Sequence, residues 1–165
     1  MRTIKAEELK VETFLPFGFY ANLLDPDAEK IGKEPIEFYR DMLQQDLGGQ
    51  AIVSFSTCRV EKRAMVVDVT EYHTKTGEGC LPLDNDILIH VGPATPGAVP
   101  PLEKIRVFRV PQGTMVVLRP GVWHHAAFTI DSRPANVLIV LPERTYANDC
   151  VVVELKKADQ IAVSV

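Results

Sequence analysis

The chain has 165 residues, of which 46% are hydrophobic and 24% are charged, and its formal net charge is −4. This size fits one domain, because domains average about 150 residues, and the hydrophobic fraction excludes intrinsic disorder. The negative charge argues against nucleic-acid binding, which needs a dense positive face, and no apolar run approaches the about 18 residues of a membrane span.

The ends and the cysteines indicate a cytoplasmic protein. The N-terminal segment MRTIKAEELKVE is charged throughout and lacks the apolar core of a secretion signal. Cys58, Cys80 and Cys150 form no CxxC pair and are odd in number. This usage is typical of reduced thiols, which we expect to pack as small hydrophobic side chains.

The first predicted element is a helix over residues 34–47. Pro35 suits a first helical position, and apolar residues recur from Ile36 to Leu47 at helical spacing. Gly48 and Gly49 would then end the helix.

From Gln50 onward the pattern changes to strands separated by turn-forming residues. The longest connection, the Pro/Gly-rich stretch 92–101, is interpreted as one surface loop, because strands continue on both sides of it. Many short strands with little helix predict a single mainly β domain over residues 1–165, built as a sandwich or barrel. The predicted strands cover residues 51–55, 65–72, 87–91, 105–110, 114–118, 124–130, 137–141 and 151–155.

Two of the four histidines, His73 and His124, lie on the apolar faces of predicted strands, and His73 comes at the end of its strand. Residues two apart in a strand share a face, so Glu71 and His73 continue the apolar face that begins at Met65. A barrel-lining strand that becomes polar near its mouth has this pattern. Glu78 follows after Thr76-Gly77, a predicted bend.

The second histidine segment is Trp123-His124-His125. His124 shares the more apolar face of its predicted strand with Phe128 and is expected to point inward, whereas His125 points toward a partner or solvent. His90, the fourth histidine, is expected to be structural.

Together these residues resemble the two cupin motifs. The pattern is Glu71-x-His73-x4-Glu78, then Gly113-x6-Pro120-Gly121-x2-His124, with Glu71 where the cupin motif has its first histidine. The resemblance implies a cupin-like β-barrel or jelly roll, with the short helix N-terminal to it, that holds a metal on Glu71, His73, Glu78 and His124. Two imidazoles and two carboxylates suit a divalent ion such as Ni, Mn, Fe or Zn better than Ca.

The stretch GVWHHAAF, residues 121–128, is similar to the GVWHHPL signature of the ureidoglycolate lyase family. The resemblance covers about residues 50–155 and includes Glu71-Tyr72-His73-Thr74, Glu78 and Pro82 at the family's spacing. The chain also departs from the family: Glu78 replaces a glutamine, residues 117–119 replace Asn-Tyr-His, Ala126 replaces a proline, and an Asn-Asn-Gly element has no match. Fold and metal site should therefore carry over better than the substrate does.

The resemblance implies a metal-dependent lyase that cleaves a small carbinolamine or hydroxy acid of the ureidoglycolate type to glyoxylate and urea. Glu71 or Glu78 could serve as the base, and His125 could orient His124 or contact the substrate. Arg59 or Arg119 could pair with the substrate carboxylate. Trp123 is a further candidate for substrate contact, although packing is the simpler interpretation.

Two other functions stay open. The departures at Glu78 and Arg119 leave room for another cupin enzyme, an isomerase or an oxygenase. The missing Asn-Asn-Gly element leaves room for a non-catalytic cupin that binds a small carboxylate. In each case we expect a small-molecule partner, no nucleic acid and no membrane, and a homodimer that pairs through exposed strands.

Overall fold

Sixteen short strands and very little helix make up the computed structural model, which describes residues 1–165. The two α-helices, α1 (Val11–Phe14) and α2 (Thr145–Asn148), have four residues each. A single 3₁₀ turn covers Leu102–Lys104. No helix has the length and apolar character needed to cross a membrane. The mainly β prediction is confirmed.

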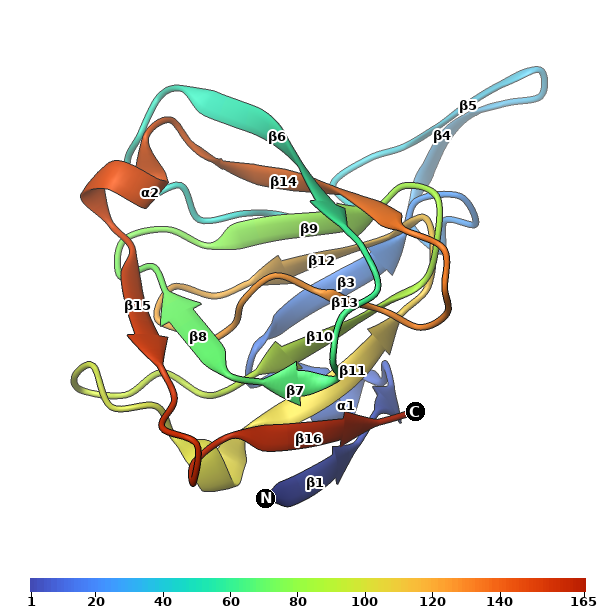
Figure 1. Ribbon diagram of the computed structural model, residues 1–165. Coiled ribbons are helices and arrows are strands. Elements are labelled where there is room, and N and C mark those ends of the chain that lie inside the picture. The colour runs from blue at the N-terminus through green and yellow to red at the C-terminus, as the bar shows by residue number, and fades with distance from the viewer.

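The larger sheet has five antiparallel strands (Figure 1). Its interior face carries alternate residues of each strand, because side chains in a strand alternate between faces. In spatial order the strands are β3 (Gly18–Asn22), β12 (Thr114–Leu118), β9 (Glu78–Pro82), β14 (Ala135–Pro142) and β6 (Val53–Val60).

Three smaller sheets form the opposite wall (Figure 1). A cluster of 17 buried hydrophobic residues fills the space between this wall and the five-stranded sheet, which gives the jelly-roll arrangement that the sequence predicts. The wall consists of β13 (Phe128–Thr129), β10 (Ile87–Val91), β11 (Arg106–Val110) and β2 (Glu7–Glu8); β15 (Val151–Glu154) and β8 (Val69–Tyr72); and β1 (Arg2–Lys5), β16 (Ile161–Ser164) and β7 (Val66–Val67).

The predicted helix over residues 34–47 is wrong. Its first half belongs to a hairpin of β4 (Lys30–Lys33) and β5 (Ile36–Tyr39), and residues 40–47 are irregular. The alternation of Ile36 and Phe38 fits a strand as well as a helix, and both side chains are exposed, so no helical stripe is buried here. The side chain of Gln45 instead donates hydrogen bonds to the carbonyls of Gly77 and Val140. The short N-terminal helix is α1.

Most of the other predicted strands are found, with two kinds of difference. The segment 124–130 is a regular strand only at β13, and its first residues join the wall through single bridges at Trp123 and His124. The strands β1, β2, β3, β9 and β16 were not predicted. In β9 the pattern is hidden by Gly79 and Pro82, which have low strand propensity.

Candidate metal centre

Two crossing segments carry the candidate site in the barrel interior. Glu71 and His124 face each other as an antiparallel pair: the Glu71 N–H donates to the His124 carbonyl at 2.6 Å, and the His124 N–H donates to the Glu71 carbonyl at 2.8 Å. Opposed residues, and residues two apart, project from one face. The side chains of Glu71, His73 and His124 therefore leave the backbone on the same side, and the ring centroids of the two histidines are 5.3 Å apart.

Glu78 closes the group from β9. Its Oε2 atom lies 3.0 Å from His73 Nε2 and 3.2 Å from His124 Nε2. One ligand atom from each residue lies within 4.8 Å of the others, and the three residues are 2%, 5% and 5% exposed. The structure thus brings together three of the four predicted metal ligands.

Backbone carbonyls orient both imidazole rings. His73 Nδ1 lies 2.6 Å from the Asp149 carbonyl, and His124 Nδ1 lies 2.8 Å from the Val122 carbonyl. A carbonyl oxygen only accepts, so each Nδ1 carries a hydrogen and donates it. Each neutral ring therefore directs the bare lone pair of Nε2 at the carboxylate of Glu78, and this arrangement is repulsive unless a proton or a cation lies between them.

The electrostatics show that a proton takes this place in the absence of metal. Burial alone would raise the pKa of Glu78, but the two imidazoles lower it well below its ordinary range. Burial alone would lower the pKa of His124, but the charge and hydrogen bond of Glu78 raise it to about 9. At neutral pH the metal-free group is therefore an imidazolium–carboxylate pair.

The same atoms fit a divalent ion. Ligand atoms about 2.0–2.2 Å from one ion at tetrahedral or octahedral angles lie about 3.0–3.5 Å apart, and the two Nε2–Oε2 distances are 3.0 and 3.2 Å. Metal-bound histidines usually donate their second N–H to a carbonyl or carboxylate, as His73 and His124 do here. Two nitrogens with carboxylate oxygen suit Mn, Fe, Ni or Zn.

Glu71, the fourth predicted ligand, lies beside this group rather than in it. Its Oε2 atom accepts a hydrogen bond from the Cys150 thiol at 3.3 Å, and its Oε1 atom lies 4.0 Å from His125 Nδ1. The His125 ring is half-buried, its Nδ1 accepts the backbone N–H of Ala126 at 2.6 Å, and burial lowers its pKa although the charge of Glu71 opposes this. Glu71 and His125 are thus neighbours of the candidate metal ligands.

The other predicted site residues lie elsewhere. Trp123 is fully buried, donates its indole N–H to Thr95 Oγ1 at 2.9 Å and packs on Tyr72 with a centroid distance of 4.5 Å, so packing is its role in this structure. His90 is buried, with Nε2 3.1 Å from the hydroxyl of Thr70, which fits the structural role expected of it.

Neither predicted arginine is brought to the three-residue group. Arg119 is exposed, and its guanidinium stacks 4.3 Å from the ring centroid of Phe19. Arg59 is exposed beside Glu61. Arg59 is opposite Asn136 of β14. Val140, four residues further along β14, is the one that pairs with Gly79, the neighbour of Glu78, so Arg59 lies well along the sheet from the group.

Sequence reasoning missed the contribution of residues 145–150 and of Cys80. The ring of Tyr146 lies edge-on to His73 with centroids 5.7 Å apart, although Tyr146 as a whole is 56% exposed. Partial burial together with nearby carboxylates raises the pKa of Tyr146. Asp149 and Cys150 follow with the carbonyl and thiol contacts described above. Cys80 donates its thiol hydrogen to Glu78 Oε1 at 3.4 Å, so both oxygens of Glu78 are engaged.

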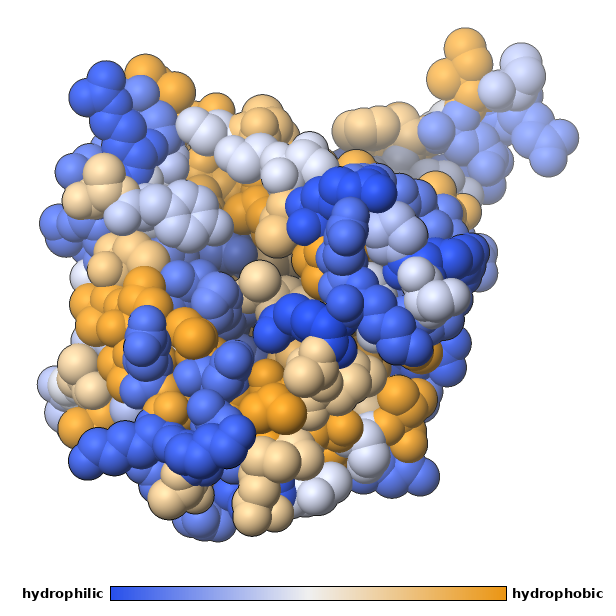
Figure 2. All heavy atoms as spheres, viewed as in Figure 1, coloured by the Kyte–Doolittle hydropathy of each residue, from blue (hydrophilic) through white to orange (hydrophobic).

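The surface of the protein has a recess between α2 and the end of β6. In the view of Figure 2 a recess lies near the middle of the molecule, between the residues over α2 on one side and those over the end of β6 and the loop after it on the other. Apolar side chains are visible within it, and hydrophilic side chains border it (Figure 2). A recess of this kind is typical of small-molecule sites.

Comparison with known proteins gives a family and a fold. The sequence model of the family described as "Ureidoglycolate lyase" matches residues 1–163. The chain is 27% identical to the ureidoglycolate lyase of Stutzerimonas stutzeri (strain A1501), over 91% of this chain and 88% of that protein. It is 29% identical to the ureidoglycolate lyase of Pseudomonas syringae pv. syringae (strain B728a), with the same coverage. The structure of a dTDP sugar isomerase from Desulfovibrio desulfuricans G20 has a TM-score of 0.53 and 15% identity, over 87% of this chain and 89% of that one, which supports the fold alone.

Proposed function

Because this chain belongs to the ureidoglycolate lyase family, we propose that it is a metal-dependent lyase that cleaves ureidoglycolate to glyoxylate and urea. The observation that carries the proposal is the buried group of His73, Glu78 and His124, at positions that the cupin motifs reserve for metal ligands, in a chain that the family matches almost end to end. The metal itself is part of the proposal.

The substrate sets three chemical requirements. Ureidoglycolate is a carbinolamine, whose central carbon bears a hydroxyl, a carboxylate and a urea nitrogen. Its cleavage needs a group that removes the hydroxyl proton, a group that protonates the leaving nitrogen, and a positive centre that holds the negative charge. A divalent ion bound to His73, Glu78 and His124 would supply that centre and lower the pKa of the hydroxyl.

Glu71 is better suited than Glu78 to act as the base. The pKa of Glu78 is held well below its ordinary range by two imidazoles, so its carboxylate is a weak proton acceptor at neutral pH. Glu71 lies next to the group and outside it, with one oxygen held by Cys150 and the other near His125. We therefore assign proton removal to Glu71 and the ligand role to Glu78.

We assign substrate contact to His125. Its Nδ1 accepts a backbone N–H, so in the neutral ring the hydrogen is on Nε2 and can be donated. The side chain is 33% exposed, so a small molecule can reach it. Arg59, Arg119 and Trp123 lie outside the group, so the proposal does not depend on them.

The proposal also includes the substrate class, the oligomeric state, the location and the metal. We propose a small carboxylate as substrate, a homodimer as the working form, and a cytoplasmic location, consistent with three free cysteines. The bound ion would be Mn, Fe, Ni or Zn, which two nitrogens and a carboxylate oxygen suit.

The test is turnover by purified full-length protein loaded separately with each of these metals. Ureidoglycolate should yield urea and glyoxylate in equal amounts, and a chelator should abolish this activity. The variants His73→Ala, His124→Ala and Glu78→Gln should lose metal content, whereas Glu61→Gln, the same change at an exposed glutamate, should not. Full metal content with no urea release would refute the lyase. Oxygen uptake, or tight carboxylate binding without turnover, would favour the oxygenase or the binding protein instead.

A further inference from the structure

The hairpin of β4 and β5 has one apolar face that nothing in the chain covers. Ile31 is opposite Phe38, and Lys33 is opposite Ile36. Opposed residues and residues two apart share a face, so all four side chains project on the same side. The three apolar residues Ile31, Ile36 and Phe38 are 51%, 78% and 62% exposed.

The other face of the hairpin is polar and internally bonded. Lys30 Nζ lies 2.6 Å from Glu37 Oε1, and the Tyr39 hydroxyl donates to Glu37 Oε2 at 3.2 Å. The two strands pair only with each other and project from the body of the molecule (Figure 1). An isolated two-stranded hairpin is marginally stable in water. Contact of its apolar face with another surface would therefore stabilise the hairpin.

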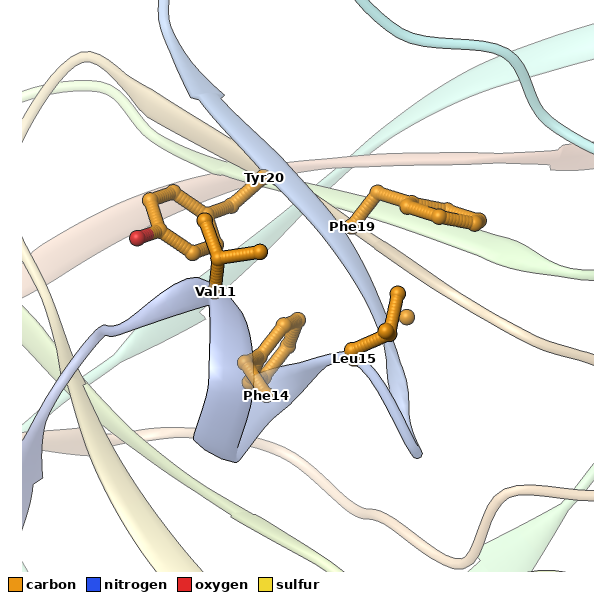
Figure 3. Close-up of a pocket in the computed structure, with 6 residues that line it drawn as sticks. Val11, Phe14, Leu15, Phe19 and Tyr20 are labelled. Carbon is orange, nitrogen blue, oxygen red and sulfur yellow. The ribbon is translucent and has the colours of Figure 1, made fainter.

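A second uncovered apolar surface lies on α1 and along β3, and we call it the α1–β3 patch. It surrounds a cavity of about 80 Å³ between these two elements (Figure 3). Such a volume is several times the about 10–15 Å³ that one water molecule needs, so it has room for the end of an aliphatic side chain. Three exposed residues of the patch line this cavity: Val11 at 61%, Leu15 at 46% and Phe19 at 43%. We include in the patch the two residues that directly follow β3, Leu23 at 41% and Leu24 at 73%, which lie outside the cavity.

We propose that the apolar face of the hairpin packs on the α1–β3 patch of a second copy of the chain, and that the partner's hairpin does the same in return. This exchange forms a two-fold dimer, in which the same two surfaces are used twice. The inference rests on the homodimer proposed above and assigns its surfaces, and it does not depend on the lyase activity.

The areas favour this exchange over contact between two hairpins. A stable interface buries about 800 Å² on each partner. From their exposed fractions and whole side-chain areas of about 150–250 Å², the three hairpin residues offer only about 350 Å². The five patch residues raise the exposed apolar area to about 850 Å² on each copy.

Charge complementarity points to the same pairing. Lys33 lies on the apolar face of the hairpin, and Asp25 and Asp27 are one and three residues after the patch residue Leu24. All three charged side chains are exposed, and none forms an ion pair within its own chain. In the exchange they come from opposite copies. A second copy therefore supplies both the apolar surface and the charges that this hairpin lacks.

The experiment is sedimentation velocity of the full-length protein at about 1–100 µM, where a stable dimer is resolved from monomer. The double variant Ile36→Glu/Phe38→Glu and the patch variant Leu24→Glu should each raise the dimer dissociation constant at least about hundredfold. Phe55→Glu is the matched control, because Phe55 is 72% exposed on β6, outside both surfaces. Circular dichroism and thermal unfolding establish that each variant folds.

Mixing the two dissociated variants gives a test specific to the exchange. A mixed dimer keeps one of the two contacts, between the unaltered hairpin of one copy and the unaltered patch of the other, so the mixture should associate more tightly than either variant does alone. The variant Lys33→Asp should weaken the dimer, and Asp25→Lys in addition should restore it. This charge pair carries the test if the hairpin double variant does not fold.

Three results would overturn the proposal. The first is a monomeric unaltered protein at about 100 µM. The second is dissociation by the hairpin variant together with an unaffected Leu24→Glu variant, because hairpins would then pack on each other or elsewhere. The third is a dimer that Phe55→Glu dissociates and the hairpin variant does not, which would place the interface on β6.

Discussion

Metal binding should compete with the proton that Glu78 holds on His124. A metal ligand must be the neutral imidazole, so binding at neutral pH releases this proton. Raising the pH from 7 to 9 should therefore tighten metal binding, and the metal should stabilise the protein more at the higher pH. Glu78 stays ionised across this range, because its pKa is held far below it.

The magnitude follows from the pKa of His124, which is raised to about 9 from an ordinary value of 6.5. At pH 7 about 1% of the rings are neutral, so the apparent dissociation constant should be about a hundredfold weaker than at pH well above 9, and it should fall about tenfold between pH 7 and 8. Because the folded pKa lies above the unfolded one, protonation stabilises the metal-free fold fully below about pH 6.5. This contribution, about 3 kcal/mol, is lost as the pH rises through about 9.

The assay is calorimetric titration of the metal-free protein with Mn²⁺ or Ni²⁺ at pH 7, 8 and 9. Repeating it in buffers with different ionisation enthalpies counts the protons released, and about one is expected per ion at pH 7. The Glu61→Gln variant, changed at an exposed site, should behave like the unaltered protein. A dissociation constant that is equal at pH 7 and 8, with no proton released, would refute the account of His124.

Substitutions at four further positions separate the roles of neighbouring side chains. Glu71→Gln should lower kcat at least about a hundredfold with metal content unchanged, because it removes the base and keeps the ligands; loss of metal in atomic absorption would instead make Glu71 a ligand. Cys80→Ala should weaken metal binding about tenfold, and Cys80→Ser should restore it, since the hydroxyl can donate to Glu78 in place of the thiol; equal affinity in titrations of both variants would contradict this. Tyr146→Phe should raise KM for ureidoglycolate about fivefold and leave metal content intact, because only the hydroxyl is removed; unchanged steady-state kinetics would exclude a substrate contact. Trp123→Phe should lower Tm by about 2–4 °C through the lost hydrogen bond to Thr95 while KM stays the same; a changed KM would return Trp123 to the substrate site.

Local alternation was enough to predict much of the site. Strand parity placed Glu71 and His73 on one interior face and turned His124 inward, because a period of two depends only on neighbours in sequence. The same reasoning turned His125 toward a partner or solvent, whereas its ring is half-buried with Nδ1 4.0 Å from Glu71 Oε1. Strand parity, however, determines only the face from which a side chain leaves the backbone, and not the position of the terminal atoms of a long, flexible side chain. The carboxylate of Glu71 therefore reaches Cys150 instead of the three-residue group.

The prediction of a helix over residues 34–47 failed because its apolar residues have no surface in the same chain on which a helix could pack. Apolar residues from Ile36 to Leu47 match helical spacing, but short helices gain their stability from packing an apolar face. Here the sheet surface beside this segment is contacted by Gln45 in an irregular conformation, and Ile36 and Phe38 project outward on the hairpin. If the proposed dimer forms, the surface that stabilises this segment belongs to another chain, and no single-chain pattern could reveal it.

The contribution of residues 145–150 depends on the pairing of two distant strands. Val151 of β15 is opposite Tyr72 of β8, so the residues just before Val151 necessarily lie beside those just after Tyr72. This register brings the Asp149 carbonyl to His73 and the Cys150 thiol to Glu71, and α2 sets Tyr146 against the His73 ring. A shift of one residue would turn each of these side chains to the opposite face. Because one register fixes both the ring orientation of a ligand and the surroundings of the proposed base, the order of this strand pair is a condition for the chemistry as well as for the fold.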